Sequence, residues 1–153
     1  SFLFDLSKTC KFINLAEESF DDGYENVSVD AIQKICNNML EGTIKLRKLW
    51  MAVTKNWGIE FLKLMEINYR DGWLYSDRHI EAYKIIVDEE DDQNSDLIDN
   101  AFVIFNGNLE IHISLNILCD FVSDITLTMF DTQELLEKAK DDENYVRIDL
   151  PSN

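Results

Sequence analysis

Two β-rich runs flank an Asn-Gly pair, and this arrangement constrains the fold more than any other feature of the chain. The runs AFVIF and NLEIHISL lie on either side of Asn106 and Gly107. Both residue types tolerate the positive φ angles that a two-residue type I′ turn requires. The sequence therefore predicts an antiparallel hairpin in which residues 101–105 pair with residues 108–114.

Helical spacing of apolar residues marks the first third of the chain. Ser28 can cap a helix whose apolar positions recur over residues 29–40, and Gly42 follows it. The pattern resumes over residues 44–57, after which Gly58 is a natural C-terminal stop. Because Gly costs about 1 kcal/mol relative to Ala inside a helix, two helices that meet at Gly42 are favoured over a single kinked one.

The second of these predicted helices carries two tryptophans and four cations. Trp50 and Trp57 fall on its apolar stripe, so we expect both to be mostly buried. The polar side carries Lys45, Arg47, Lys48 and Lys55. Cations interleaved with aromatic residues are also typical of nucleic-acid binding, but a chain with a net charge of -16 repels a polyanion unless its basic face is well isolated. Direct binding to nucleic acid is therefore not expected.

Shorter patterns follow in the middle of the chain. Residues 58–69 fit a short helix or a strand, since apolar runs of this length do not separate the two. Residues 79–87 are rich in β-branched and aromatic side chains and predict a strand. Apolar residues recur at helical spacing over residues 114–129, which favours a helix, although the run ITLTMF also has strand character.

The C-terminal part completes an α+β pattern. Asp131 with Glu134 resembles the capping box of a short helix, and residues 145–150 alternate like a terminal strand. We therefore predict a single α+β domain over residues 1–153. In this prediction, N-terminal helices pack on a small, mostly antiparallel sheet, with further helices near the C-terminus.

Composition favours a cytoplasmic location. No apolar run approaches the roughly 20 residues that a membrane span requires, and no basic leader precedes the opening SFLFDLSKTCKF, so neither a membrane association nor a signal peptide is expected. Cys10, Cys36 and Cys119 are widely spaced and form no CxxC pair. This usage of cysteine is typical of a reducing compartment.

Charge is distributed unevenly along the chain. Residues 1–30 hold seven acids and two bases, residues 31–84 hold six acids and nine bases, and residues 85–153 hold seventeen acids and three bases. A field of this size affects solubility, association rate and choice of partner rather than the fold. The C-terminal half is therefore expected to meet a basic partner.

A strongly acidic domain without a catalytic motif suits a binding role. The phosphate-binding patterns GxGxxG and GxxxxGK[ST] and the hydrolase pattern GxSxG are all absent, and no cofactor is expected. The sequence therefore predicts a non-enzymatic inhibitor, of the immunity-protein or nucleic-acid-mimic kind, that neutralises a basic toxin, nuclease or DNA-binding protein. The expected contact residues are Asp88, Glu89, Glu90, Asp91, Asp92, Asp96, Asp99, Asp141, Asp142 and Glu143.

A metal-dependent hydrolase is one alternative. Asp77, His79 and Glu81 alternate on one predicted strand, and Glu110 and His112 alternate on another. If the two strands were neighbours, these side chains could bind zinc and activate a water molecule. The same spacing is typical of the wet face of an antiparallel sheet, so no metal is expected.

Two further alternatives remain. A calcium-binding loop is one of them, because positions 1, 3, 5, 7, 9 and 12 of such a loop would be filled by Asp88, Glu90, Asp92, Asn94, Asp96 and Asp99. Gln93, however, stands where an EF-hand needs glycine, and the twelfth position is Asp rather than the longer Glu. The other alternative is a structural or adaptor subunit that docks through an apolar helix face, with the charge serving only solubility.

Overall fold

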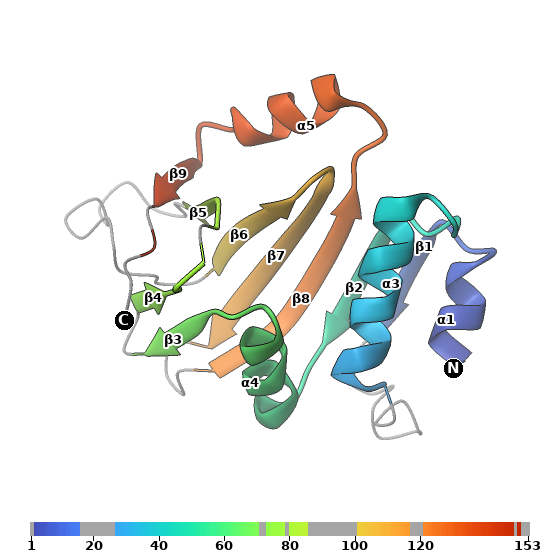
Figure 1. Cartoon of the computed structure of the whole chain (residues 1–153), viewed down its shortest axis with the longest axis horizontal. Helices are drawn as coiled ribbons and strands as arrows, with labels where there is room; N and C mark the ends of the chain where they lie inside the picture. The colour runs from blue at the N-terminus through green and yellow to red at the C-terminus, as the bar shows by residue number, and fades with distance from the viewer. Residues whose placement is uncertain are drawn as a thin grey trace.

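A seven-stranded sheet forms the centre of the molecule (Figure 1). The computed structural model describes residues 2–15, 27–70, 73–78, 80–85, 101–116, 121–148 and 150. The strands lie in the order β1-β2-β8-β7-β6-β5-β9, and every neighbouring pair is antiparallel except β1 with β2. Their bounds are β1 (Phe12–Leu15), β2 (Lys48–Ala52), β5 (Ala82–Ile85), β6 (Ala101–Asn106), β7 (Leu109–Asn116), β8 (Phe121–Met129) and β9 (Tyr145–Ile148). A separate two-stranded sheet consists of β3 (Asn68–Arg70) and β4 (Trp73–Tyr75).

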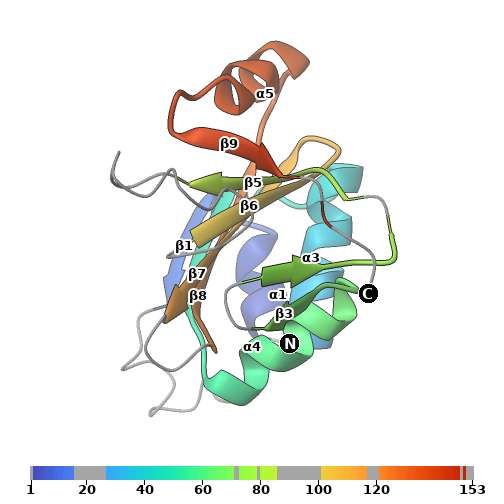
Figure 2. The ribbon, with the colours of Figure 1, turned by 90° about the vertical axis from the view of Figure 1, so that its left-hand side faces the viewer.

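Helices are interspersed among these strands. The described ones are α1 (Phe2–Ser7), α3 (Val29–Glu41), α4 (Lys55–Leu64) and α5 (Gln133–Lys140). Figure 2 shows α1, α3 and α4 on one side of the main sheet, with α5 beyond its end. The predicted α+β class and the mostly antiparallel sheet are confirmed. The predicted grouping of helices ahead of the strands is wrong, because β1 precedes α3 and β2 precedes α4.

Within the described residues, no helix has both the length and the apolar character needed to cross a membrane.

The predicted hairpin is present, but its turn lies one residue further along the chain. β6 and β7 pair antiparallel, and Asn106 is itself paired with Leu109. Gly107 and Asn108 are therefore the two turn residues, and only Gly107 has a positive φ, at 57°. This pattern is that of a type II′ turn, which needs glycine at its first central position, rather than of the predicted type I′ turn.

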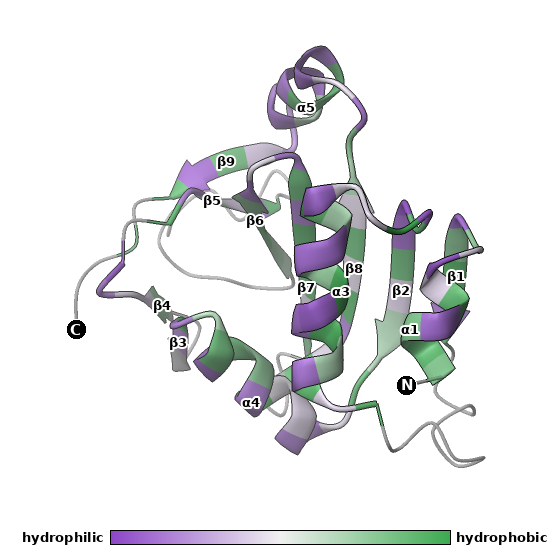
Figure 3. Ribbon diagram, turned by 45° about the vertical axis from the view of Figure 1, so that its right-hand side comes forward, coloured by the Kyte–Doolittle hydropathy of each residue, from purple (hydrophilic) through white to green (hydrophobic). Residues whose placement is uncertain are grey.

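Helix α3 forms where the sequence predicts it. The Ser28 hydroxyl accepts a hydrogen bond from the backbone N–H of Ala31, at 3.1 Å, and so caps the first turn. Gly42 ends the helix with a φ of 74°, in the left-handed conformation that glycine adopts without a steric penalty. Figure 3 shows hydrophobic and hydrophilic bands along this helix, as an amphipathic pattern requires.

The predicted second helix over residues 44–57 is wrong. This segment contains β2, which lies between β1 and β8, and the start of α4. Leu49 and Met51 are fully buried, and Trp50 between them points to the other side of the sheet. Pairing with distant strands therefore overrides the helical spacing. Trp50 and Trp57 are both partly buried, but they lie on different elements and share no stripe.

The helix expected over residues 114–129 is also wrong, since residues 121–129 form β8. A β-bulge explains the misleading spacing: Ser114 pairs with Asp124 and Leu115 pairs with Val122, which leaves Ser123 without a partner strand residue. The extra residue puts Val122 and Ile125 on the same face, three positions apart, as in a helix. The expected short helix and terminal strand are present as α5 and β9, although Thr132 rather than Asp131 caps α5.

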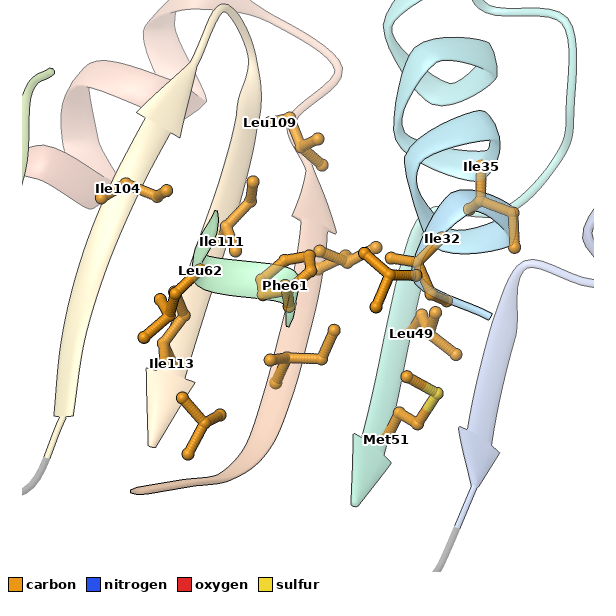
Figure 4. Packing of buried hydrophobic residues seen from close by; sticks show 14 of the residues in the cluster. Ile32, Ile35, Leu49, Met51, Phe61, Leu62, Ile104, Leu109, Ile111 and Ile113 are labelled. Carbon is orange, nitrogen blue, oxygen red and sulfur yellow. The ribbon is translucent and has the colours of Figure 1, made fainter. Parts of the chain in front are cut away.

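The core fills the space between the main sheet and the helices. Figure 4 shows Ile32 of α3 and Phe61 of α4 in this space, together with Leu49, Ile111 and other sheet residues. Alternation along the strands sends the remaining side chains to the opposite side. We call that side the polar face; it includes Lys48, Trp50, Tyr83, Phe105, Glu110, His112, Asp124, Thr126, Thr128, Tyr145 and Arg147.

Candidate functional site

Helix α5 and the turn that follows it carry a group of exposed carboxylates, which we call the α5 acidic ridge. The ridge consists of Glu134, Glu137, Asp141, Asp142 and Glu143. All five are exposed, and none forms an ion pair with another residue in the part of the chain that the structure describes. Figure 3 shows α5 as largely hydrophilic. Within the described part of the chain, these five carboxylates therefore have no counter-ion.

One member of the ridge also has a structural role. The Asp142 carboxylate accepts a hydrogen bond from the backbone N–H of Asn144, at 2.9 Å, in the turn that leads into β9. Asp141 and Glu143 form no such bond within the described residues. Substitutions at Asp141 and Glu143 can therefore test charge without disturbing this turn.

A network of charges around Glu81 holds α5 against the sheet. Lys140 Nζ lies 3.3 Å from the Glu81 carboxylate and 5.1 Å from the centre of the Phe105 ring. Arg147 of β9 lies 3.7 Å from the same carboxylate, and the Tyr83 hydroxyl donates to it at 2.7 Å. The Tyr83 hydrogen bond, followed by Lys140 and Arg147, holds the pKa of Glu81 below its usual value. The ridge is thus presented by a helix whose C-terminal end is fixed.

Glu110 and Tyr145 form a half-enclosed pair on the polar face. The Tyr145 hydroxyl donates to the Glu110 carboxylate at 3.2 Å, and the Glu110 residue is only 8% exposed. Burial raises the pKa of Glu110, with the negative charge of Asp142 adding to the effect, while Tyr145 and Lys48 lower it. Burial, followed by the charge of Glu110, also raises the pKa of Tyr145. The phenol therefore stays protonated and serves as a donor.

His112 lies two residues from Glu110 on the same face. Burial lowers its pKa, and the charge of Lys48 adds to this, whereas Asp124 on β8 acts in the opposite direction. The imidazole is therefore neutral at neutral pH and can act as either a donor or an acceptor of hydrogen bonds.

The structure brings together only half of the predicted metal cluster. Glu110 and His112 share the polar face, but Asp77 lies beside Glu66 and Asn68, near the end of α4, on the side that carries the helices. The prediction that Asp77 and Glu81 share a strand is wrong, because β4 ends at Tyr75 and β5 begins after Glu81. His79 lies outside the described residues, and among the described ones no group of three or more His, Cys, Asp or Glu side chains could hold a metal ion.

Seven of the predicted contact residues lie outside the part of the chain that the structure describes. Asp88, Glu89, Glu90, Asp91, Asp92, Asp96 and Asp99 all lie outside the described residues. The same holds for the run that resembles a calcium loop. Of the predicted contact residues, Asp141, Asp142 and Glu143 are described, and they lie together where α5 ends.

A basic groove was not apparent in the sequence. Lys8, Lys11, Lys45 and Arg47 line an open groove of about 920 Å³ near the ends of α1 and α3. Two of these cations have partners: Lys8 lies 3.7 Å from Asp5, and Arg47 lies 3.1 Å from Asp131. The groove is built from residues in separate segments, so their spacing gave no signal.

No protein-family model, curated protein or solved structure matches the chain.

Proposed function

We propose that the chain is a non-enzymatic binding protein that neutralises a basic protein partner, such as a toxin, a nuclease or a DNA-binding protein. One observation carries the proposal: the α5 acidic ridge presents five exposed carboxylates with no counter-ions among the described residues. A cationic surface of the partner would supply the missing counter-ions. Carboxylates arranged in this way increase the rate of encounter with a basic surface and select against acidic partners.

The contacts that hold α5 against the sheet support this proposal. Lys140 and Arg147 are bound to Glu81, so two of the three cations in residues 85–153 are turned toward the polar face. Because α5 is already held in place, the partner would not need to order it on binding. Preorganisation of this kind lowers the free-energy cost of association. The proposal also includes the acids of residues 88–99, which lie outside the described residues.

Association kinetics test the proposal. The partner would first be captured from cells that produce the protein and identified by mass spectrometry. Its association rate would then be measured at two or more salt concentrations, where we expect a steep fall as salt rises, because steering is screened over about 8 Å at physiological ionic strength. A captured partner that is not basic, or a rate indifferent to salt, would contradict the proposal.

Matched charge variants locate the contact. Replacing Asp141→Asn together with Glu143→Gln should slow association without changing the fold, because both side chains are exposed and unpaired among the described residues. The control is the double variant Glu41→Gln and Glu60→Gln, which neutralises two exposed acids, one on α3 and one on α4. The control has the same net charge, so equal slowing in both double variants would mean that only total charge matters. Neutralising Asp88, Glu90, Asp91 and Asp92 together tests the second patch.

A further inference from the structure

A cavity of about 320 Å³ lies between α3, α4 and the β6–β7 hairpin. Most of its lining lies on the helical side of the sheet, and Glu81 and Phe105 belong to the lining at the edge of the polar face. Figure 4 shows Ile104, Leu109 and Ile111 of the hairpin on the helical side, with Phe61 of α4 nearby. These four side chains are buried and line the cavity, together with the partly buried Leu64 and Met65 of α4. Apolar side chains therefore form the floor of the cavity.

The rim of the cavity is polar. Gln33 and Asn37 of α3 lie on one side, Asn106 of the hairpin lies on another, and Arg78 and Glu81 complete it. An apolar interior with a few convergent polar groups is the usual construction of a small-molecule site. At about 30 Å³ for each water-sized group, the cavity has room for about ten non-hydrogen atoms.

A buried hydroxyl holds the backbone at Arg78, which lies at this rim. The Ser76 hydroxyl, in a residue that is 2% exposed, donates to the backbone carbonyl of Glu66 at 2.9 Å and accepts from the backbone N–H of Arg78 at 3.1 Å. Glu66 itself has a φ of 60°, a left-handed conformation that is uncommon for a residue other than glycine. The Arg78 Nε lies 3.4 Å from the Glu66 carboxylate. The guanidinium has further N–H donors to offer to a ligand.

The charges at the rim favour a ligand with one negative charge. Glu81 is the other charged residue of the lining, and its carboxylate is already paired with Lys140 and Arg147. The exposed ion pair between Glu66 and Arg78 is accessible to solvent and weak, so a second carboxylate can share the guanidinium. A neutral ligand would leave this donor unused, and a cationic ligand would be repelled by it.

We propose that this cavity binds a small amphiphile with an apolar body and a single carboxylate, such as a medium-chain fatty acid. Its apolar body would lie against Phe61, Ile104 and Ile111, and its carboxylate would accept hydrogen bonds from Arg78. Octanoate, with ten non-hydrogen atoms, matches the available volume. This site is independent of the α5 acidic ridge and of the proposed partner.

Titration with octanoate tests the inference, with the methyl resonances of Ile104 and Ile111 followed by NMR. Both methyl groups should shift in a saturable manner, while those of Ile32 and Ile125, buried outside the lining, should not. 1-Octanol, which has the same chain without the charge, should bind about tenfold more weakly, as expected for loss of a charge-assisted hydrogen bond. Equal affinity for octanoate and 1-octanol, or no shift of the Ile104 and Ile111 methyl groups, would overturn the proposal.

Three variants sharpen the test. Arg78→Gln should weaken octanoate binding about tenfold and leave 1-octanol unchanged. Glu66→Gln should strengthen octanoate binding, because it removes the carboxylate that competes for Arg78. Lys55→Gln, which removes an exposed cation of α4 outside the cavity lining, is the matched control and should change neither affinity. An equal loss in Arg78→Gln and Lys55→Gln would show that general charge, rather than Arg78, attracts the acid, and would overturn the assignment.

A last variant tests the location independently of charge. Leu64→Trp enlarges a partly buried side chain of the cavity wall and should abolish the binding of both octanoate and 1-octanol. Unchanged methyl resonances of Ile32 and Ile125 would establish that the fold is intact. Undiminished binding in this variant would place the ligand elsewhere and overturn the proposal.

Discussion

Replacing Gly58 with alanine should destabilise this protein, although the same change stabilises most helices. Gly58 lies inside α4, where alanine is normally favoured by about 1 kcal/mol. In this helix, however, an added Cβ would lie 2.7 Å from the Cβ of Val122 on β8. Ordinary contacts begin at 3.4 Å, so α4 and β8 would have to separate by about 0.7 Å.

The expected size of the effect follows from these opposing terms. Overpacking of a core costs about 1–3 kcal/mol. The upper part of that range applies, because both Cβ atoms are fixed to the backbone and neither can rotate away. The gain in helix propensity offsets about 1 kcal/mol of this cost. Gly58→Ala should therefore lower the free energy of unfolding by about 1–2 kcal/mol. For a chain of this length the corresponding fall in Tm is about 2–8 °C.

Urea denaturation followed by far-UV circular dichroism measures this difference by linear extrapolation. Asn56→Ala is the control, since Asn56 is an exposed residue of the same helix and should show only a small gain from helix propensity. If Gly58→Ala stabilised the protein as much as the control, the close approach of α4 to β8 would be refuted.

Two further predictions concern residues of the polar face and the core. Trp57→Ala should lower the free energy of unfolding by about 3–4 kcal/mol, because Trp57 packs on Phe61 and donates its indole N–H to the Val27 carbonyl at 2.9 Å. Trp50→Ala should cost only about 1–2 kcal/mol, since Trp50 is partly buried on the polar face; equal losses in urea denaturation would contradict these placements. Burial raises the pKa of Glu110, so its contribution to stability is present below the unfolded pKa and is lost as pH rises through the folded pKa. Glu110→Gln should therefore stabilise the protein near pH 7 and have little effect near pH 3, whereas a loss of stability near pH 7 would show that the charged carboxylate is needed.

Local signals in the sequence were sufficient for elements that depend on local chemistry. The cap at Ser28 and the left-handed Gly42 bound α3 as expected. Glycine in the hairpin was correctly read as a turn residue, although the turn moved by one position because Asn106 joined the strand. In each case the deciding interactions lie within a few residues of one another.

Elements that depend on distant pairing were not predictable in this way. The five residues of β2 become a strand because β1 and β8 pair with both of its edges. In the candidate site, too, some features follow from the local sequence and others depend on distant pairing. The exposure of Asp141 and Glu143 was expected from charge alone, whereas Tyr145 meets Glu110 across 35 positions of sequence. That contact depends on the order of the strands, which hydrophobic periodicity does not reveal.

The β-bulge in β8 links the mistaken helix to the proposed cavity. Without an extra residue at Ser123, strict alternation would place Val122 on the polar face, because Ile125 lies on the core face. The bulge returns Val122 to the core side, where it lies close to Gly58. This contact sets how near α4 comes to the sheet, and the same helix supplies Phe61 to the cavity. The spacing that made this segment look helical is therefore the feature that positions the cavity wall.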